Sequence, residues 1–136
     1  MLLATDNTAL SDGGGLSQTD SVDFTLHRVV LHNNAAKGRG GGLIVQQRSR
    51  ANLTKVVLLG NHAERGGAAF VALNSIVSLN ASVLMNNSAA EGGAIAVDAS
   101  QSMTTTGARL FSCFTSSNQA SSKGGAALRL WGCIGD

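Results

Sequence analysis

One phrase recurs along this chain and restricts its fold more than any other feature. Each copy has an asparagine, an alanine two residues later, a short charged turn and a pair of glycines, as in NSAAEGGAIAV from Asn87 to Val97. The other copies are NTALSDGGGL from Asn7, NAAKGRGGGL from Asn34, NHAERGGAAF from Asn61 and NQASSKGGAAL from Asn118. The steps between these asparagines are 27, 27, 26 and 31 residues. Periods of about 20–50 residues indicate stacked repeat architectures.

Composition favours a narrow stack of small residues over a wide globular core. The 136 residues fit one domain, residues 1–136, with 43% hydrophobic but only 4% aromatic residues, 17 glycines and no proline or tyrosine. Small side chains let backbones stack closely. The net charge of +2, with dispersed basic residues, gives no reason to expect nucleic acid or an acidic membrane as a partner.

Three apolar runs per repeat predict three short strands. After each glycine pair, alignment on the second glycine predicts that the first and third residues point inward, which turns Ile44, Val71, Ile95 and Val97 outward. A second run, rich in β-branched residues, precedes each asparagine, and a shorter third run lies between the two. Three strands and three turns in roughly 26 residues describe one coil. We therefore predict an all-β solenoid of about four to five coils.

Helical repeats do not fit this pattern, because glycine pairs interrupt every copy and no segment keeps a 3.6-residue apolar period over three turns. The repeat pattern runs to both ends of the sequence without a polar capping segment, so we expect a fragment of a longer repeat protein. Exposed strand edges on the terminal coils would favour end-to-end self-association.

The repeat positions have separate structural roles. Stacking puts the asparagines in one column, where inward amides can bond to each other and to the turn backbone. The glycine pairs allow a tight turn with positive φ where the next coil approaches closely. The predicted structural ladder is Asn7, Asn34, Asn61, Asn87 and Asn118. The predicted turn glycines are Gly14, Gly15, Gly41, Gly42, Gly66, Gly67, Gly92, Gly93, Gly124 and Gly125.

The charged turn between asparagine and glycines is expected to face solvent. Arg65, Glu91 and Lys123 precede successive glycine pairs. Opposite charges one coil apart could pair there, with a contribution of about 0–1 kcal/mol at a surface.

Two short motifs carry a family resemblance. GGA or GGAI occurs at Gly66-Gly67-Ala68, Gly92-Gly93-Ala94-Ile95 and Gly124-Gly125-Ala126, and a leucine (Leu31, Leu58 or Leu84) precedes three of the asparagines by three residues. This combination resembles the repeats of chlamydial polymorphic outer membrane proteins, whose signatures are GGA[I/L/V] and FxxN. The resemblance covers nearly the whole chain. It implies a right-handed parallel β-helix, as in autotransporter-like surface passengers and adhesins, and an extracellular or cell-surface location, although the stretch after Met1 has no signal-peptide pattern.

A carbohydrate-active enzyme of the pectin-lyase-like class is the alternative, since parallel β-helices also carry polysaccharide lyases and hydrolases. Hydrolysis of a glycosidic bond needs two neighbouring carboxylates. Asp20 and Asp23 are the closest local pair outside the repeat turns, and neither recurs in the next coil. A lyase would need a cluster of carboxylates to bind calcium and a basic residue. Near equivalent repeat positions the chain has only one carboxylate, Asp98, and one basic residue, Arg129. We therefore predict no catalytic residues in this chain.

No metal or cofactor is expected. His27, His32 and His62 share no column, whereas a metal site needs three or four convergent ligands. The glycine-rich segment 38–42 leads into a strand and not into a helix, unlike a phosphate-binding loop.

Three asparagines and two cysteines complete the candidates. Asn52, Asn80 and Asn86 begin N-x-S/T sequons, which are candidate glycosylation sites. Cys113 and Cys133 could form a disulfide or remain two separate thiols, and the sequence favours neither.

We expect a non-enzymatic β-helix segment of a cell-surface or secreted protein that acts as a structural rod or as an adhesion and binding surface. The expected partner is a cell-surface protein or a polysaccharide. No membrane span is expected, since no stretch approaches about 18 apolar residues. The face that follows the glycine pairs, with its outward Ile and Val, is the predicted contact surface.

Overall fold

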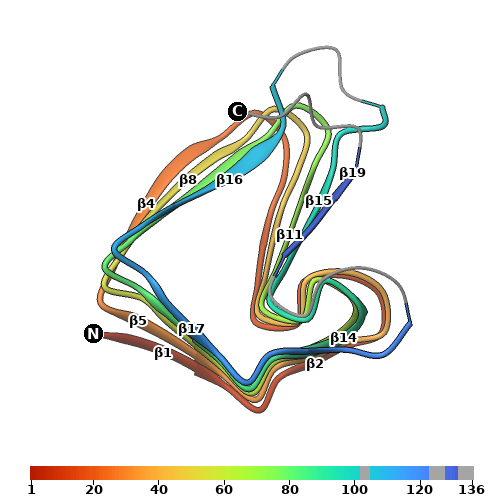
Figure 1. The fold of residues 1–136 in the computed structure, drawn as a ribbon. Coiled ribbons are helices and arrows are strands. Elements are labelled where there is room, and N and C mark those ends of the chain that lie inside the picture. Colours follow the sequence, from red (N-terminus) through yellow and green to blue (C-terminus); the bar gives the residue numbers. More distant parts are fainter. Residues whose placement is uncertain (102–104, 123–127, 132–136) are drawn as a thin grey trace.

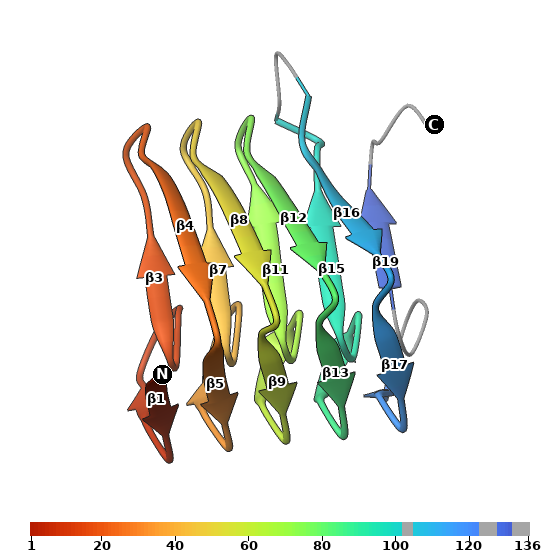
Figure 2. The ribbon, with the colours of Figure 1, turned by 90° about the vertical axis from the view of Figure 1, so that its left-hand side faces the viewer.

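The computed structural model describes residues 1–101, 105–122 and 128–131. These residues form strands and turns, without a helix, and wind into a right-handed parallel β-helix of about four turns. Figure 1 shows the coils superposed along the axis, and Figure 2 shows them stacked side by side in sequence order. The predicted fold class is confirmed.

Equivalent strands of successive coils pair in parallel. Sheet A lies before the repeat asparagine and contains β1 (Leu2–Thr5), β5 (Val29–His32), β9 (Val57–Leu59), β13 (Val83–Met85) and β17 (Phe114–Ser116). Sheet B follows the asparagine and contains β2 (Thr8–Ala9), β6 (Ala35–Ala36), β10 (His62–Arg65), β14 (Ser88–Glu91) and β18 (Gln119–Ala120).

Two further sheets complete each coil. Sheet C follows the glycines and contains β3 (Leu16–Gln18), β7 (Leu43–Val45), β11 (Ala69–Ala72), β15 (Ile95–Asp98) and β19 (Leu128–Trp131). Sheet D contains β4 (Asp23–His27), β8 (Arg50–Thr54), β12 (Ile76–Asn80) and β16 (Gly107–Phe111). We call the chain between each strand of sheet B and the next strand of sheet C the hook, because it bends back beside sheet B before entering sheet C (Figure 1).

Each coil thus has four strands where the sequence predicted three. The missed strand is that of sheet B, whose residues were expected to be part of a turn. Its strands are only two to four residues long and rich in alanine, so neither β-branched content nor an alternating pattern marks them. They are extended because each pairs with its neighbours in adjacent coils, as Ser88 does with His62 and Gln119.

The core is a column of aliphatic side chains that runs through the coils. Leu31, Leu58 and Leu84 of sheet A stack in register, and Leu53 and Leu79 of sheet D belong to the same buried cluster. All five are at most 1% exposed. Burial of a leucine side chain contributes about 1.5–3 kcal/mol. The repeat therefore concentrates its stability in one narrow interior.

The register of sheet C corrects the predicted alignment by one residue. Leu43 pairs with Ala69, and Ala69 pairs with Ile95. The first two glycines of the triplets in coils one and two therefore align with the glycine pairs of later coils, and Gly42 aligns with Ala68. This alignment was missed because a triplet can be matched to a pair in two ways.

The one-residue shift reverses the predicted faces in the later coils, since successive strand residues point to opposite sides. Val71, Ile95 and Val97, expected outside, belong to the main core, whereas Phe70 and Ala96, expected inside, lie in a separate cluster on the outer face with Ile44. Leu43 and Val45 point inward and Ile44 outward, as predicted.

The first two glycines of each hook serve different purposes. The first, as at Gly66 with a φ of 67°, adopts a left-handed conformation that costs glycine little. The second lies against sheet B of the next coil. A Cβ at Gly41 would meet the carbonyl oxygens of His62 and Gly67, so only hydrogen fits there. Gly124 and Gly125 lie outside the described residues.

We predict that Gly41→Ala lowers the free energy of unfolding by about 2–4 kcal/mol, because the added methyl group forces two stacked backbones apart. Urea denaturation followed by circular dichroism measures the change. Gly107→Ala is the matched control, since an added Cβ there has no atom within 4 Å, and its effect is expected within about 0.5 kcal/mol. Equal unfolding midpoints for the two variants would contradict this role for Gly41.

Candidate binding surfaces

The five repeat asparagines form a continuous hydrogen-bonded column at the corner between sheets A and B. In each step the Oδ1 atom of one asparagine accepts two bonds, from the backbone N and from the Nδ2 of the asparagine one coil earlier. At Asn61, these come from Asn34 at 3.0 and 3.1 Å. The same pair of bonds joins Asn7 to Asn34, Asn61 to Asn87 and Asn87 to Asn118.

In the four later asparagines, the remaining amide hydrogen of the side chain donates to a carbonyl of the earlier coil. Asn61 Nδ2 donates to the carbonyl of Leu31 at 2.9 Å, and Asn87 Nδ2 donates to that of Leu58 at 2.8 Å. Asn34, Asn61 and Asn87 are 0% exposed. Their side-chain oxygens and nitrogens are thus hydrogen-bonded without water, which removes the cost of burying an amide.

We predict that Asn61→Ala destabilises the protein by about 2–4 kcal/mol. The substitution leaves the backbone N and Nδ2 of Asn34 without their acceptor in a buried position. Asn52→Ala is the control, because Asn52 is exposed on sheet D, and it should change stability by less than about 0.5 kcal/mol. Both values come from denaturant titration, and a loss at Asn61 no larger than at Asn52 would show that the ladder contributes little.

The outer face of sheet C does not present the predicted contact surface. Ile44 and Phe70 point outward there but are 0% exposed. The guanidinium carbons of Arg39, from the hook after β6, and of Arg65, at the end of β10, lie 5.2 and 5.1 Å from the centre of the Phe70 ring, within the range of cation–π attraction. The Phe70 ring of this face is therefore covered by arginine side chains.

Carboxylates surround these two arginines. Arg39 donates from Nη2 and Nε to Asp12 Oδ2 at 2.6 and 3.2 Å. Arg65 donates from Nη2 to Asp98 Oδ2 at 3.0 Å, and its Nε lies 3.5 Å from Glu91 Oε2. We call these five residues the arginine cluster. The predicted pairing of Arg65 with Glu91 is present, but both side chains are more than 70% buried and do not form a solvated face.

Sequence reasoning missed most of this cluster because of the glycine misalignment. When the first glycines are aligned, the residue before them is Asp12, Arg39, Arg65 and Glu91 in successive coils. In this column each arginine is next to an acidic residue, Asp12 beside Arg39 and Glu91 beside Arg65. Alignment on the second glycine hides this charge pattern. Lys123, at the next repeat, lies outside the described residues.

Two carboxyl groups of the cluster have lowered pKa values. Burial alone would raise the pKa of Asp12, but its hydrogen bonds with the side chain and backbone of Arg39, and the charge of Arg39, lower it overall. Burial likewise raises the pKa of Asp98, and hydrogen bonds with Ser100 and Arg65 outweigh it. Both groups are therefore carboxylates at neutral pH.

Lowered pKa values in the folded state imply acid sensitivity. Ionised Asp12 and Asp98 stabilise the fold above their unfolded pKa of about 3.9, and this contribution is lost as the pH falls through the lower folded values. We predict that the melting temperature falls as the pH is lowered from about 5 towards 2, and falls less steeply in Asp12→Asn/Asp98→Asn. Asp23→Asn, which removes an exposed carboxylate, should keep the wild-type slope. Parallel melting curves for all three proteins would contradict the assignment.

A cavity of about 240 Å³ opens beside the arginine cluster. Arg39, Arg65 and Asp98 contribute to its wall, Ala72 and Leu73 line it from the end of β11, and Ser100 and Gln101 line it from the segment after β15. The cavity combines charged groups and hydrogen-bonding groups with a small apolar area.

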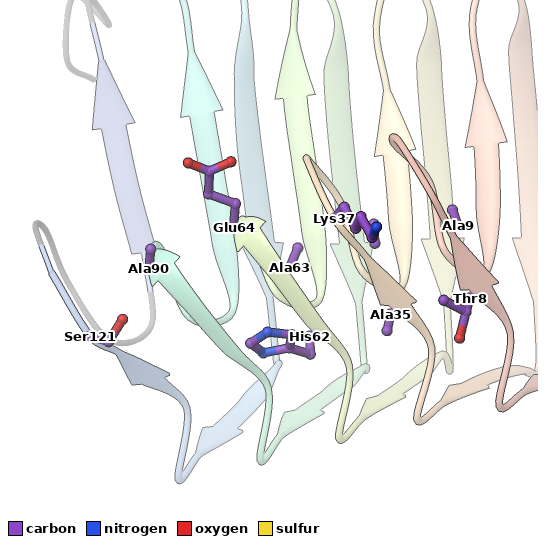
Figure 3. A pocket seen from close by; sticks show the side chains of 10 residues that line it. Thr8, Ala9, Ala35, Lys37, His62, Ala63, Glu64, Ala90 and Ser121 are labelled. Atoms are coloured by element: carbon purple, nitrogen blue, oxygen red, sulfur yellow. The ribbon is translucent and has the colours of Figure 1, made fainter.

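A second, shallower depression follows the outer side of sheet B. It has a volume of about 470 Å³ and is lined by residues of all five repeats, from Thr8 to Ser121. Figure 3 shows His62 and Glu64 on β10 with Lys37 nearby, among small side chains such as Ala35 and Ala90. This groove therefore runs across the strands, along the solenoid axis.

The remaining sequence candidates are dispersed. Asn52, Asn80 and Asn86 are exposed. The described residues contain no group of three or more His, Cys, Asp or Glu side chains that could hold a metal ion. Cys113 has a free thiol that contacts the Leu79 and Phe111 carbonyl oxygens at 3.4 Å. Cys133 lies outside the described residues.

The pectin-lyase-like alternative considered two further sets of residues as catalytic candidates, Asp98 with Arg129 and Asp20 with Asp23. Arg129 of β19 is paired in register with Ala96, two residues before Asp98. Asp23 lies 3.7 Å from Arg50, and Asp20 is at the corner that precedes β4.

Comparison of the chain with protein-family models, with curated proteins and with solved structures found no match. Among the residues described above, no helix has the length and hydropathy needed to cross a membrane.

Proposed function

We propose that the chain is a non-enzymatic segment of a cell-surface or secreted protein, a rigid rod whose outer surface binds a partner. The groove of sheet B is the observation that carries this proposal. Its lining comes from equivalent positions of successive coils, so these positions recur at about 4.8 Å per strand. A repeating surface of this kind suits an extended polymer lying along the axis, such as a polysaccharide or an extended peptide of a surface protein.

Rigidity supports the same function. The asparagine ladder joins every described coil to the next, and the apolar interior is buried from Leu31 through Leu84. A contact surface built on such strands is held in place before the partner arrives, which lowers the entropic cost of binding. The groove lining itself consists of small residues with Lys37, His62 and Glu64 at intervals, and both charge signs are present.

Two features of the surface fit the proposed location and partners. The three sequon asparagines are exposed, as glycosylation on a secretory route would require. Leu2, Leu3, Phe111 and Phe114 are exposed apolar residues on the first and last sheet edges, and end-to-end association of copies through these edges remains part of the proposal.

Retention on immobilised neutral and acidic polysaccharides, with products assayed in the same samples, tests this function. We expect retention without cleavage, and a loss of at least about tenfold in affinity for Ala35→Trp, which fills the groove. Thr25→Trp, which adds the same bulk to an exposed position on sheet D, should bind as the wild type does. Cleavage products abolished by substitution of Asp98 or Arg129 would instead support the pectin-lyase-like alternative. Retention unaffected by Ala35→Trp would rule out the groove as the binding surface.

A further inference from the structure

The fourth coil departs from the repeat at one place. Its asparagine-to-asparagine step is 31 residues where the preceding step is 26. The excess falls entirely between sheets C and D, because β11 ends at Ala72 and β12 begins at Ile76, whereas β15 ends at Asp98 and β16 begins at Gly107. The described ends of this longer connection extend beyond the corners of the earlier coils (Figure 2). An extended loop on a regular scaffold is a common position for a binding site.

This insertion builds one side of the 240 Å³ cavity, since Ser100 and Gln101 belong to it. Arg39 of an earlier hook and Arg65 at the end of β10 also line it. We propose that this cavity binds a neutral, hydroxylated ligand, and that the chemical class is a single saccharide unit. The site lies on sheet C and is independent of the groove proposed on sheet B.

The charge of the arginine cluster disfavours an anion. Arg39 and Arg65 carry two positive charges, and Asp12, Glu91 and Asp98 carry three negative ones. The guanidinium groups are thus already compensated, and a further carboxylate or phosphate would enter a site with surplus negative charge. A ligand without net charge avoids this repulsion.

The hydrogen-bonding groups match hydroxyls, which both donate and accept. Asp98 supplies carboxylate oxygens. The bonds of Arg39 to Asp12 use Nε and Nη2, which leaves the Nη1 hydrogens for a ligand. Among the described residues the Gln101 amide has no hydrogen-bond partner, so it can offer a donor and an acceptor. Ala72 and Leu73 provide apolar area for the C–H face of a sugar ring.

The arginines are held in place before a ligand arrives. Both guanidinium groups lie over the buried ring of Phe70, and each is bonded to a carboxylate of a neighbouring coil or strand. Preorganised polar groups lose little side-chain entropy on binding. The volume is below the range of about 300–1,000 Å³ that accommodates drug-sized ligands, which limits the occupant to about one ring.

Titration of the ¹⁵N-labelled protein with maltose, cellobiose, lactose and N,N′-diacetylchitobiose, each to millimolar concentration, tests the proposal by NMR. We expect at least one of these sugars to shift the amide signals of Ala72, Leu73, Ser100 and Gln101 while those of Ala35 and Ala90, in the groove of sheet B, stay unchanged. Gln101→Ala should weaken this binding about three- to tenfold. Gln119→Ala, an exposed glutamine outside the cavity, should leave it unchanged.

Three results would overturn the inference. They are the absence of any response at the cavity residues across the four sugars, equal affinity of the wild type and Gln101→Ala, and tighter binding of digalacturonate, an acidic disaccharide, than of every neutral one. Shifts confined to Ala35 and Ala90 would support the groove and reject the cavity, so the outcomes for the two surfaces are separable.

Discussion

The hydrogen bonding of each coil to the next, in a fixed register, is the constraint on which this structure depends. A parallel sheet can in principle slip by one residue, which would exchange its inner and outer faces. The buried asparagine opposes such slippage, because its Oδ1 receives both a backbone and a side-chain donor from the preceding coil. These bonds form only when equivalent asparagines are adjacent. The ladder is therefore a device for register as well as for satisfying buried amides.

A fixed register turns sequence positions into columns, and the columns determine the chemistry of the surface. The residues before the first glycines form a column of two arginines between two carboxylates, from Asp12 to Glu91. Arg39 and Arg65 are neighbours in it, yet each has its own carboxylate and both lie over Phe70. The arginines cover the Phe70 ring on the outer face of sheet C. The longer connection between β15 and β16 lines a cavity beside it. The groove on sheet B arises in the same way from a column of small residues.

Features that recur identically in every repeat could be predicted from the sequence. Features that depend on contacts between sheets could not. The period, the solenoid class and the alignment of the asparagines follow from residues such as Asn34 and Asn61, which appear in every copy. The strands of sheet B could not be predicted, because Ala35–Ala36 is too short to show a pattern. Phe70 was expected inside, and its place on the outer face was missed because it depends on the correct glycine alignment; its burial there depends on Arg39 and Arg65. Asp98 was considered together with Arg129 as the acidic and basic residues of a lyase, and in the structure it is hydrogen-bonded to Arg65 and Ser100.

The asparagine ladder also has a direction. Every bond between two asparagines in it runs from a donor in one coil to an oxygen in the following coil. Loss of one member therefore affects its two neighbours unequally: the earlier coil loses the acceptor of two N–H groups, while the later coil retains an oxygen with spare lone pairs, which is the milder defect. In such a solenoid the larger hydrogen-bonding defect left by a lost asparagine therefore lies on its amino-terminal side.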